Sequence, residues 1–290
     1  LANAQAIDYP TRTIKFVVPF PSGSGTDQSA REAANDITRR TGQPVIVENK
    51  PGANGLIAAQ QVARAAPDGY TVFITSMTTQ SVNPFLYKKL PYDPVADFIP
   101  VAMISKTAMV LVVRNTEDQP KSVAELTARM QAAGSKLSFA SGNTSSLVAG
   151  KTYSNAVSSP ALHVPYKGIP QAVTDLMAGA VDFMFSDLTV ANPLVQQGRL
   201  RGLGVTGPTR ASTLPDVPTM REAGMPIELS VWNGAYVPAK TPHAVVVRLN
   251  ELLNQATQSK QGQERFKQTG GTVDRMSPEE FAKFNEQEVL

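Results

Sequence analysis

The class of fold follows from residues 13–50, which read TIKFVVPFPSGSGTDQSAREAANDITRRTGQPVIVENK. Ile14 to Phe20 is an apolar run of strand length, and Asp27 to Arg40 follows with alanines that recur at the spacing of one helix face. Gly42 is suited to end that helix because glycine adopts the left-handed conformation, and Val45 to Glu48 is the next apolar strand. Strand, helix and strand in this order predict parallel pairing with the helix laid on the sheet.

The same rhythm continues beyond the first unit. We expect Asn54 to cap a helix that runs to about Ala66, and the turn Pro67-Asp68-Gly69 to lead into a strand at Tyr70 to Thr75. The later segments expected from the pattern are strands at 101–105, 108–113, 137–140, 161–164, 181–185, 200–205 and 227–237, and helices at 123–133, 147–156, 170–178, 244–256 and from 277 onward.

A proline-rich passage at Leu90 to Pro100 interrupts the pattern and suggests a domain limit. A chain of 290 residues is also long enough for two domains. We therefore predict an α/β protein with two lobes, each a mostly parallel sheet flanked by helices. Lobe 1 is expected at residues 7–101 plus 223–290 and lobe 2 at residues 102–222, with two hinge crossings near 101 and 222.

Composition excludes several functional classes. Charged residues make up 18% of the chain and the net charge is +3, with basic residues scattered singly or in pairs, which is not the pattern of a nucleic-acid binder. No apolar run is long enough to span a bilayer, so direct membrane insertion is not expected. The chain has no cysteine, and its start, LANAQA, places alanines at Ala2, Ala4 and Ala6 as around a signal-peptidase site. We expect an exported protein whose signal peptide is removed near Ala4 to Ala6.

Three loops rich in serine, threonine and glycine follow predicted strands: Phe20 to Asp27, Ser76 to Gln80, and Ser141 to Ser146. Ligands of open α/β sheets bind at the carboxyl ends of the strands. The first and third loops lead into predicted helices, whose N-terminal N–H groups favour an anion such as a carboxylate. None of the three loops contains lysine or arginine, so neutral donors are expected to hold the ligand.

An enzyme remains the alternative on these residues alone. Gly23 and Gly25 follow a strand as in the dinucleotide fingerprint of dehydrogenases, but Gln28 stands where the third glycine is required. Gly150-Lys151-Thr152 imitates the end of a phosphate-binding loop without its upstream glycine. The two histidines, His163 and His243, lie far apart in the sequence, and no metal site or cofactor is expected.

Several longer motifs resemble the solute receptors of tripartite tricarboxylate transporters, often called Bug proteins. The resemblance covers nearly all of Tyr9 to Phe284. The motifs are TIKFVVPFPSGSGTD from residue 13, GQPVIVENKPGANG from 42, APDGYT from 66, NPFLYKKLPYDPVADFIPVA from 83, HVPYKG from 163, GAVDFMFSD from 179 and LPDVPTMREAG from 214.

This resemblance implies a type II periplasmic binding fold, or Venus flytrap, that closes on a small carboxylate and catalyses no reaction. It implies a di- or tricarboxylate ligand, or an aromatic one, delivery to a membrane permease of the transporter, a periplasmic location and a monomeric receptor. Carried over position by position, the ligand contacts would be Phe20, Pro21, Ser22, Gly23, Ser24, Gly25, Thr26, Asp27, Ser76, Met77, Thr78, Thr79, Gly142, Asn143, Thr144, Ser145 and Asp187. We expect Lys167 to remain a solvated lysine beside the site.

Overall fold

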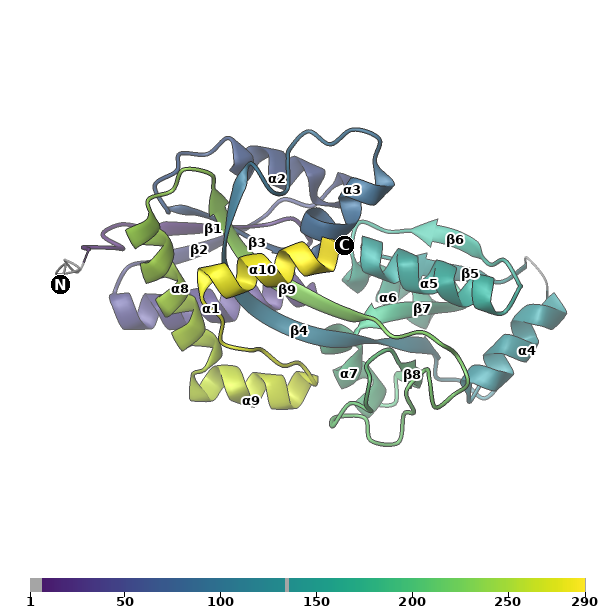
Figure 1. Cartoon of the computed structure of the whole chain (residues 1–290). Helices are drawn as coiled ribbons and strands as arrows, with labels where there is room; N and C mark the ends of the chain where they lie inside the picture. Colours follow the sequence, from purple (N-terminus) through teal and green to yellow (C-terminus); the bar gives the residue numbers. More distant parts are fainter. Residues whose placement is uncertain (1–6, 134–135, 290) are drawn as a thin grey trace.

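Strand β4 (Phe98–Arg114) belongs to two sheets. Its first part, as far as Ala108, pairs antiparallel with β9 (Ser230–Pro238). Its last part, from Met109, pairs antiparallel with β7 (Phe183–Asp187) and β8 (Leu200–Val205). The computed structural model describes residues 7–133 and 136–289, and β4 runs from its left half into its right half (Figure 1).

The first sheet is built on a parallel core. Strand β1 (Ile14–Val18) pairs parallel with β2 (Val45–Asn49) and β3 (Thr71–Ser76), and β3 then pairs antiparallel with β9. Helices α1 (Gly25–Thr41) and α8 (His243–Thr257) cover one face, while α2 (Leu56–Ala63) and α10 (Pro278–Val289) lie on the other. Successive residues of β1 therefore enter opposite cores, and both faces of the sheet are buried.

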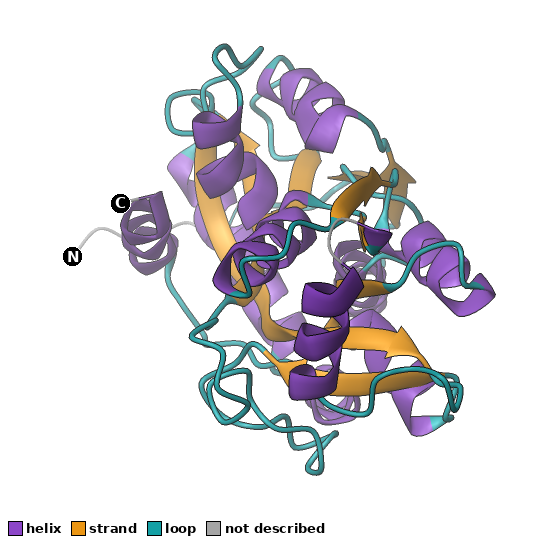
Figure 2. Cartoon of the chain, turned by 90° about the vertical axis from the view of Figure 1, so that its right-hand side faces the viewer, coloured by secondary structure: helices purple, strands orange, loops and turns teal. Residues whose placement is uncertain are grey.

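The second sheet repeats this arrangement. Strand β5 (Ser138–Ser141) pairs parallel with β6 (Leu162–Pro165) and β7. Helices α4 (Val123–Ala133) and α5 (Thr144–Ala156) pack on one face, and α6 (Ile169–Ala178) and α7 (Leu188–Gln196) on the other. A view from the right-hand side of Figure 1 shows the strands enclosed between helices (Figure 2).

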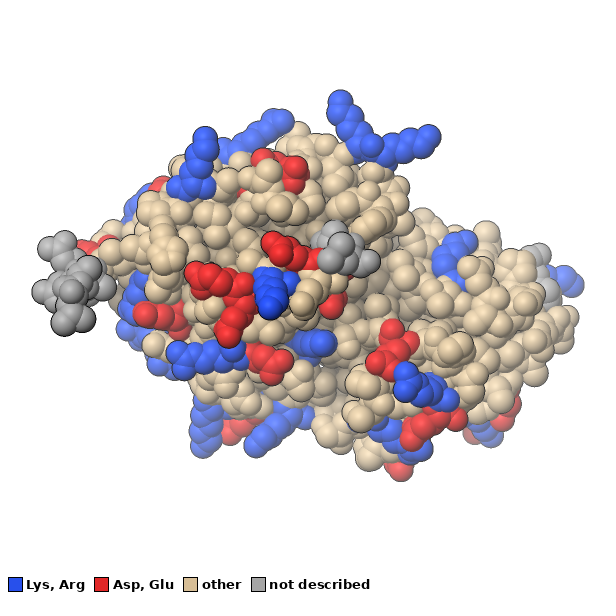
Figure 3. All heavy atoms as spheres, in the orientation of Figure 1, with Lys and Arg blue, Asp and Glu red and all other residues tan. Residues whose placement is uncertain are grey.

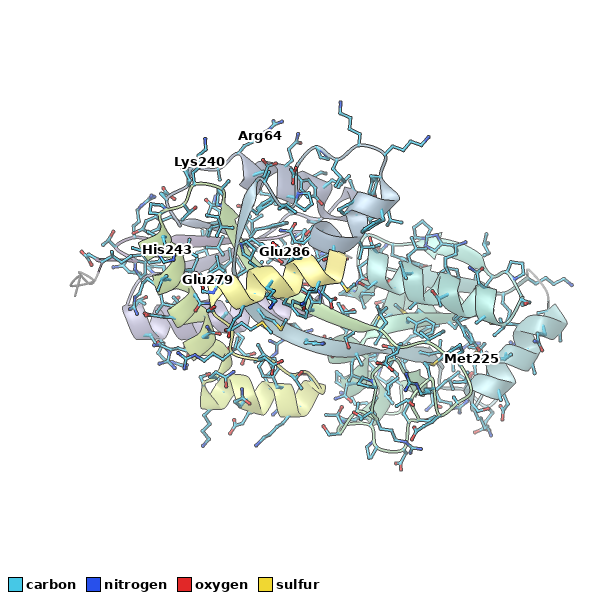
Figure 4. All side chains as sticks on the ribbon, in the orientation of Figure 1. Arg64, Met225, Lys240, His243, Glu279 and Glu286 are labelled. Carbon is cyan, nitrogen blue, oxygen red and sulfur yellow. The ribbon has the colours of Figure 1, made fainter. Side chains whose placement is uncertain are left out.

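The C-terminal helices α8 and α10 pack on the first sheet. Helix α10 begins beside α8, where His243 Nε2 lies 3.7 Å from Glu279 Oε1 (Figure 4). The indole N–H of Trp232 donates to Glu288 at 3.0 Å and fixes the other end of α10 against β9. Helix α9 (Lys260–Thr269), which the sequence pattern did not predict, comes between α8 and α10 in the chain. It contacts α8 and also α7 of the other half. Within the described residues, none of the helices has the length and hydropathy needed to cross a bilayer.

The predicted α/β, two-lobed class is confirmed, and two local predictions are wrong. Asn54 does not cap α2: it has a φ of 50°, lies within the short helix η1 (Ala53–Gly55), and its amide donates to the Tyr87 hydroxyl. The two apolar runs expected at 101–105 and 108–113 form the single strand β4, because β9 continues to pair with its backbone through Ser105 to Thr107. The predicted lobe limits at 101 and 222 stay a prediction, as does signal-peptide removal near Ala4 to Ala6, which lies outside the described residues.

Candidate functional site

The first predicted loop, Phe20 to Asp27, is stabilised by hydrogen bonds to the Asp27 carboxylate. Ser24 caps α1 by accepting a hydrogen bond from the Asp27 N–H at 3.2 Å. Asp27 Oδ2 accepts from the Gly23 N–H at 2.9 Å and from Arg31 Nε at 3.0 Å, and Oδ1 accepts from the Asn49 amide at 2.8 Å. Burial acts to raise the pKa of Asp27, but these donors keep it below its ordinary value. Asp27 thus shapes the loop, and its contact with a ligand stays a prediction.

The start of α1 is also bonded to both strands that run between the halves. The Thr26 hydroxyl donates to Asn233 Oδ1 of β9 at 2.7 Å, and the Asn233 amide donates to the Ser105 hydroxyl of β4 at 2.9 Å. All three side chains are buried. The sequence analysis missed Ser105 and Asn233, although a polar residue within the apolar segment V-W-N-G-A-Y-V was an available signal.

The second predicted loop is a buried helical turn rather than an open loop. Strand β3 ends at Ser76, and η2 (Thr78–Val82) leads directly into α3 (Asn83–Leu86). Gln80 is fully buried, and neither its amide nitrogen nor its amide oxygen has a hydrogen-bond partner within the described residues. The same holds for the hydroxyl groups of Thr78 and Ser81. Buried polar atoms of this kind are uncommon in folded proteins and mark a place where a polar ligand or water can bind.

The third predicted loop forms the N-terminus of α5. Asn143 caps the helix by accepting from the Ser146 N–H at 2.8 Å, and the Ser146 hydroxyl accepts from the Asn143 N–H at 3.2 Å. The next two residues, Thr144 and Ser145, are 1% and 2% exposed. Their hydroxyl groups have no partner within the part of the chain that the structure describes. Their N–H groups lie in the first helical turn and cannot be paired inside the helix.

Asp187 lies where β7 ends and α7 begins. Its side chain is not used to cap α7, and Oδ1 accepts one long hydrogen bond, 3.4 Å, from the Asn143 amide. Burial raises the pKa of Asp187 to about 6, with the Asn143 hydrogen bond acting in the opposite direction. The neighbouring Thr189 hydroxyl is likewise buried without a partner among the described residues.

Loops from the two halves meet at these positions. A Cβ placed on Gly25 would lie 2.7 Å from Thr189 Oγ1 and 3.3 Å from Asp187 Oδ2, and one placed on Gly168 would lie 2.6 Å from Pro21 Cδ. The structure therefore brings the first loop together with Asn143 and Asp187, and it places α5 against η2. The sequence analysis named neither Gly168 nor Thr189 as a site residue, although Gly168 directly follows Lys167 and Thr189 lies two residues after Asp187.

A cavity of about 290 Å³ opens beside this junction. Phe20 and Gly142 are the predicted site residues that line it, and Lys167 is the cation among its lining residues. Its other lining residues are Pro19, Gly52, Ala53, Asn54, Gly55, Pro165 and Tyr166. The sequence analysis did not predict the 52–55 segment as part of the site. The glycines at 52 and 55 both have positive φ, a feature that favours close backbone approach.

The candidates for other chemistry have structural roles. Gly150 lies inside α5, where a Cβ would meet the Phe139 ring at 2.4 Å, so this glycine serves packing, while Lys151 and Thr152 are exposed. His163 Nε2 lies 2.7 Å from the Ser141 hydroxyl, and burial lowers the pKa of His163. No group of three or more histidine, aspartate and glutamate side chains that could hold a metal is found within residues 7–133 and 136–289. On the face shown in Figure 3, acidic and basic side chains are interspersed.

Taken together, the site offers hydroxyl groups and two helix N-termini, which can hold an anion without a salt bridge. Comparisons with known proteins agree with this chemistry. The chain is 38% identical over 285 residues to a protein encoded in the tcbD-tcbE intergenic region of Pseudomonas sp. (strain P51), an alignment that covers 97% of this chain and 84% of the relative.

Two solved structures share the fold over nearly the whole chain. MatC from Rhodopseudomonas palustris with bound malate is 31% identical, with a TM-score of 0.91 and 97% of each chain covered. Rpa4515 from R. palustris with adipate is 30% identical, with a TM-score of 0.93, and the match covers 97% of this chain and 95% of the other. The family described as "Tripartite tricarboxylate transporter family receptor" matches residues 29–290. The chain therefore belongs to the receptor family of the tripartite tricarboxylate transporters, a family of periplasmic solute-binding proteins rather than enzymes.

Proposed function

We propose that this chain captures a small carboxylate between its two lobes and delivers it to the membrane permease of a tripartite tricarboxylate transporter. The observation that carries this proposal is the set of buried polar atoms at the junction of the loops that have no hydrogen-bond partner among the described residues. Thr78, Gln80, Thr144, Ser145 and Thr189 all contribute to this set. They come from both halves of the chain and include the first turn of α5.

The energetics of neutral donors are sufficient for a useful affinity. A hydrogen bond to a charged group contributes roughly 1.5 to 3 kcal/mol. Micromolar binding requires about 8 kcal/mol, so a few such bonds from hydroxyl and N–H groups suffice without a lysine or arginine. The two structural relatives with malate and with adipate support a carboxylate as the ligand class.

The proposed contacts are the residues carried over from the family resemblance, from Phe20 to Asp27, from Ser76 to Thr79, from Gly142 to Ser145, and Asp187. Closure is proposed as a rigid-body motion about β4 and the segment that enters β9. Strand β4 changes its pairing partner from β9 to β7 between Ala108 and Met109, and β9 begins at Ser230. Substitutions at these two positions test the proposed hinge most directly. A monomeric, exported receptor is part of the same proposal.

Thermal unfolding in the presence of a carboxylate panel tests the function. The panel contains mono-, di- and tricarboxylates, aromatic carboxylates and amino acids, and NAD serves as the negative control. A true ligand at a hundredfold excess over its Kd adds about 2.7 kcal/mol to the free energy of unfolding, and calorimetry should give one site per chain. If no member of the panel raises the melting temperature, or if NAD binds saturably, the proposed ligand class is wrong.

A further inference from the structure

Asp187 is a buried carboxylate without a cation. The residue is 7% exposed, and among the described residues its only side-chain hydrogen bond is the 3.4 Å contact from the Asn143 amide. No lysine, arginine or histidine of the described part of the chain forms an ion pair with it, and no charged group contributes to its pKa shift. Buried carboxylates are normally paired or bonded to several donors, so Asp187 lacks the partners that its ionised form requires.

The nearby charged groups of α1 do not fill this role. Arg31, in the first turns of α1, donates to Asp27 and to Asn49 rather than to Asp187. Asp27, in the same turn, has its own set of donors. From β4, which pairs with β7 from Met109 onward, the nearest charged residue in sequence is Lys106, which packs over the Phe284 ring. Lys167 lines the cavity beside the junction, but among the described residues no cation forms an ion pair with Asp187, so its charge is open to compensation by a bound molecule.

The position of Asp187 makes a ligand the natural source of that compensation. Its Oδ2 faces Gly25 in the first turn of α1, and its Oδ1 faces Asn143 at the N-terminus of α5. These are the two helix ends expected to hold the ligand carboxylate. A ligand whose carboxylate is bound at these helix ends places its remaining groups next to Asp187. A second ligand carboxylate beside Asp187 is disfavoured by charge repulsion.

Resting on the proposed function, we propose that Asp187 determines specificity: it accepts a hydrogen bond from a donor that the ligand carries beside its carboxylate. The ligand class is therefore a hydroxy- or amino-carboxylate rather than an unsubstituted one. The Thr189 hydroxyl, which is buried beside Asp187 without a partner among the described residues, is the group placed to bind the same substituent. A site with a buried acceptor discriminates strongly against a ligand that lacks the donor, because the acceptor is then left unpaired.

Calorimetric titration with matched ligands tests this assignment. The probes are succinate, malate and aspartate; glutarate, 2-hydroxyglutarate and glutamate; and phenylacetate and mandelate. At pH 8 Asp187 is ionised, since its pKa is about 6. We expect the hydroxy or amino member of at least one set to bind tenfold or more tightly than the unsubstituted member. In Asp187→Asn the preference should fall to within threefold.

The matched control is Asp182→Asn. Asp182 directly precedes β7, at the end of the strand opposite to Asp187. Its carboxylate accepts from the N–H and hydroxyl groups of Ser138. This variant should keep the wild-type preference. A wild-type protein that binds succinate, glutarate or phenylacetate as tightly as the substituted partner overturns the assignment, and so does a preference that persists in Asp187→Asn. Uptake of one proton when an unsubstituted carboxylate binds also overturns the assignment, because the Asp187 charge is then neutralised by a proton from solvent. If no probe in any set binds, the assignment of Asp187 to these ligands is overturned, and the proposed function itself fails only if the full carboxylate panel also gives no binding.

Discussion

Replacement of Asp187 by asparagine should stabilise the protein at neutral pH and leave it nearly unchanged in acid. Burial raises the pKa of this carboxyl from 3.8 to about 6. An acid whose pKa is higher in the folded state holds its proton more tightly there than in the unfolded state. The folded state is therefore favoured below pH 3.8, and stability is lost as the pH rises from there to about 6. Above pH 6 the ionised Asp187 carboxylate lowers the free energy of unfolding by the full amount.

The size of this cost follows from the shift. One unit of pKa corresponds to 1.36 kcal/mol, so a rise from 3.8 to about 6 amounts to about 3 kcal/mol. Asparagine has nearly the same shape as aspartate and can still accept from the Asn143 amide, but it carries no charge. We expect Asp187→Asn to raise the free energy of unfolding by up to about 3 kcal/mol at pH 7.5 and by less than about 1 kcal/mol at pH 4.

Urea unfolding at several pH values measures this difference. Trp232 is the single tryptophan and is buried, so its fluorescence reports the loss of the packed core. Asp27→Asn provides a control of opposite sign, because hydrogen bonds from Arg31, Gly23 and Asn49 outweigh burial and lower the pKa of Asp27. Its contribution to stability is present above pH 3.8 and is lost as the pH falls through its lower folded pKa, so Asp27→Asn should destabilise at pH 7.5. If Asp187→Asn destabilises the protein at every pH, the carboxylate is compensated and our reasoning about the site is wrong.

Three further outcomes are expected. Thr144→Ala should weaken carboxylate binding by the loss of one bond to a charged group, about 1.5 to 3 kcal/mol, whereas Lys167→Ala should weaken it less than tenfold; titrations that reverse this order would mean that an ion pair holds the anion. Gly25→Glu should abolish binding in the same titrations, because it puts bulk and like charge at the start of α1, where the ligand carboxylate is expected. Gly168→Ala should enlarge the radius of gyration measured by small-angle scattering, since its Cβ would meet the stiff Pro21 ring at 2.6 Å, and an unchanged radius would count against closure through this contact.

Local patterns were enough to predict much of the fold. Helix α4 and strand β8 have the bounds that the sequence suggested, Val123–Ala133 and Leu200–Val205. Glycine in the left-handed conformation ends α1 at Gly42, as expected. These features depend on residues close together in the chain, where helix caps and apolar periodicity determine the outcome. The loops after β1 and β5 also lie where parallel strands must end together.

Features that depend on distant contacts could not be predicted in this way. The run Ser76 to Gln80 is typical of an exposed loop, yet it is buried and helical because α5 and α10 lie against it. Strand β4 continues through the polar residues Ser105 to Thr107 because β9 pairs with its backbone there. The lack of an ion pair to Asp187 among the described residues is likewise a property of the assembled loops, since the sequence does not show which side chains Arg31 and Lys106 contact.

We propose that the buried polar groups at the junction allow a ligand to favour closure of the lobes. The hydroxyl groups of Thr144 and Thr189 are buried without a partner among residues 7–133 and 136–289, and the Asp187 carboxylate has one long hydrogen bond there. Each unsatisfied buried polar group costs about 1 to 3 kcal/mol, and water satisfies these groups when the lobes separate. A ligand that pairs with them in the closed form alone removes this cost only there. Shifting a population from one per cent closed to ninety-nine per cent closed requires about 5.5 kcal/mol of differential affinity, which two or three such groups supply. We therefore expect the ligand that fits their chemistry to be the ligand that closes the lobes.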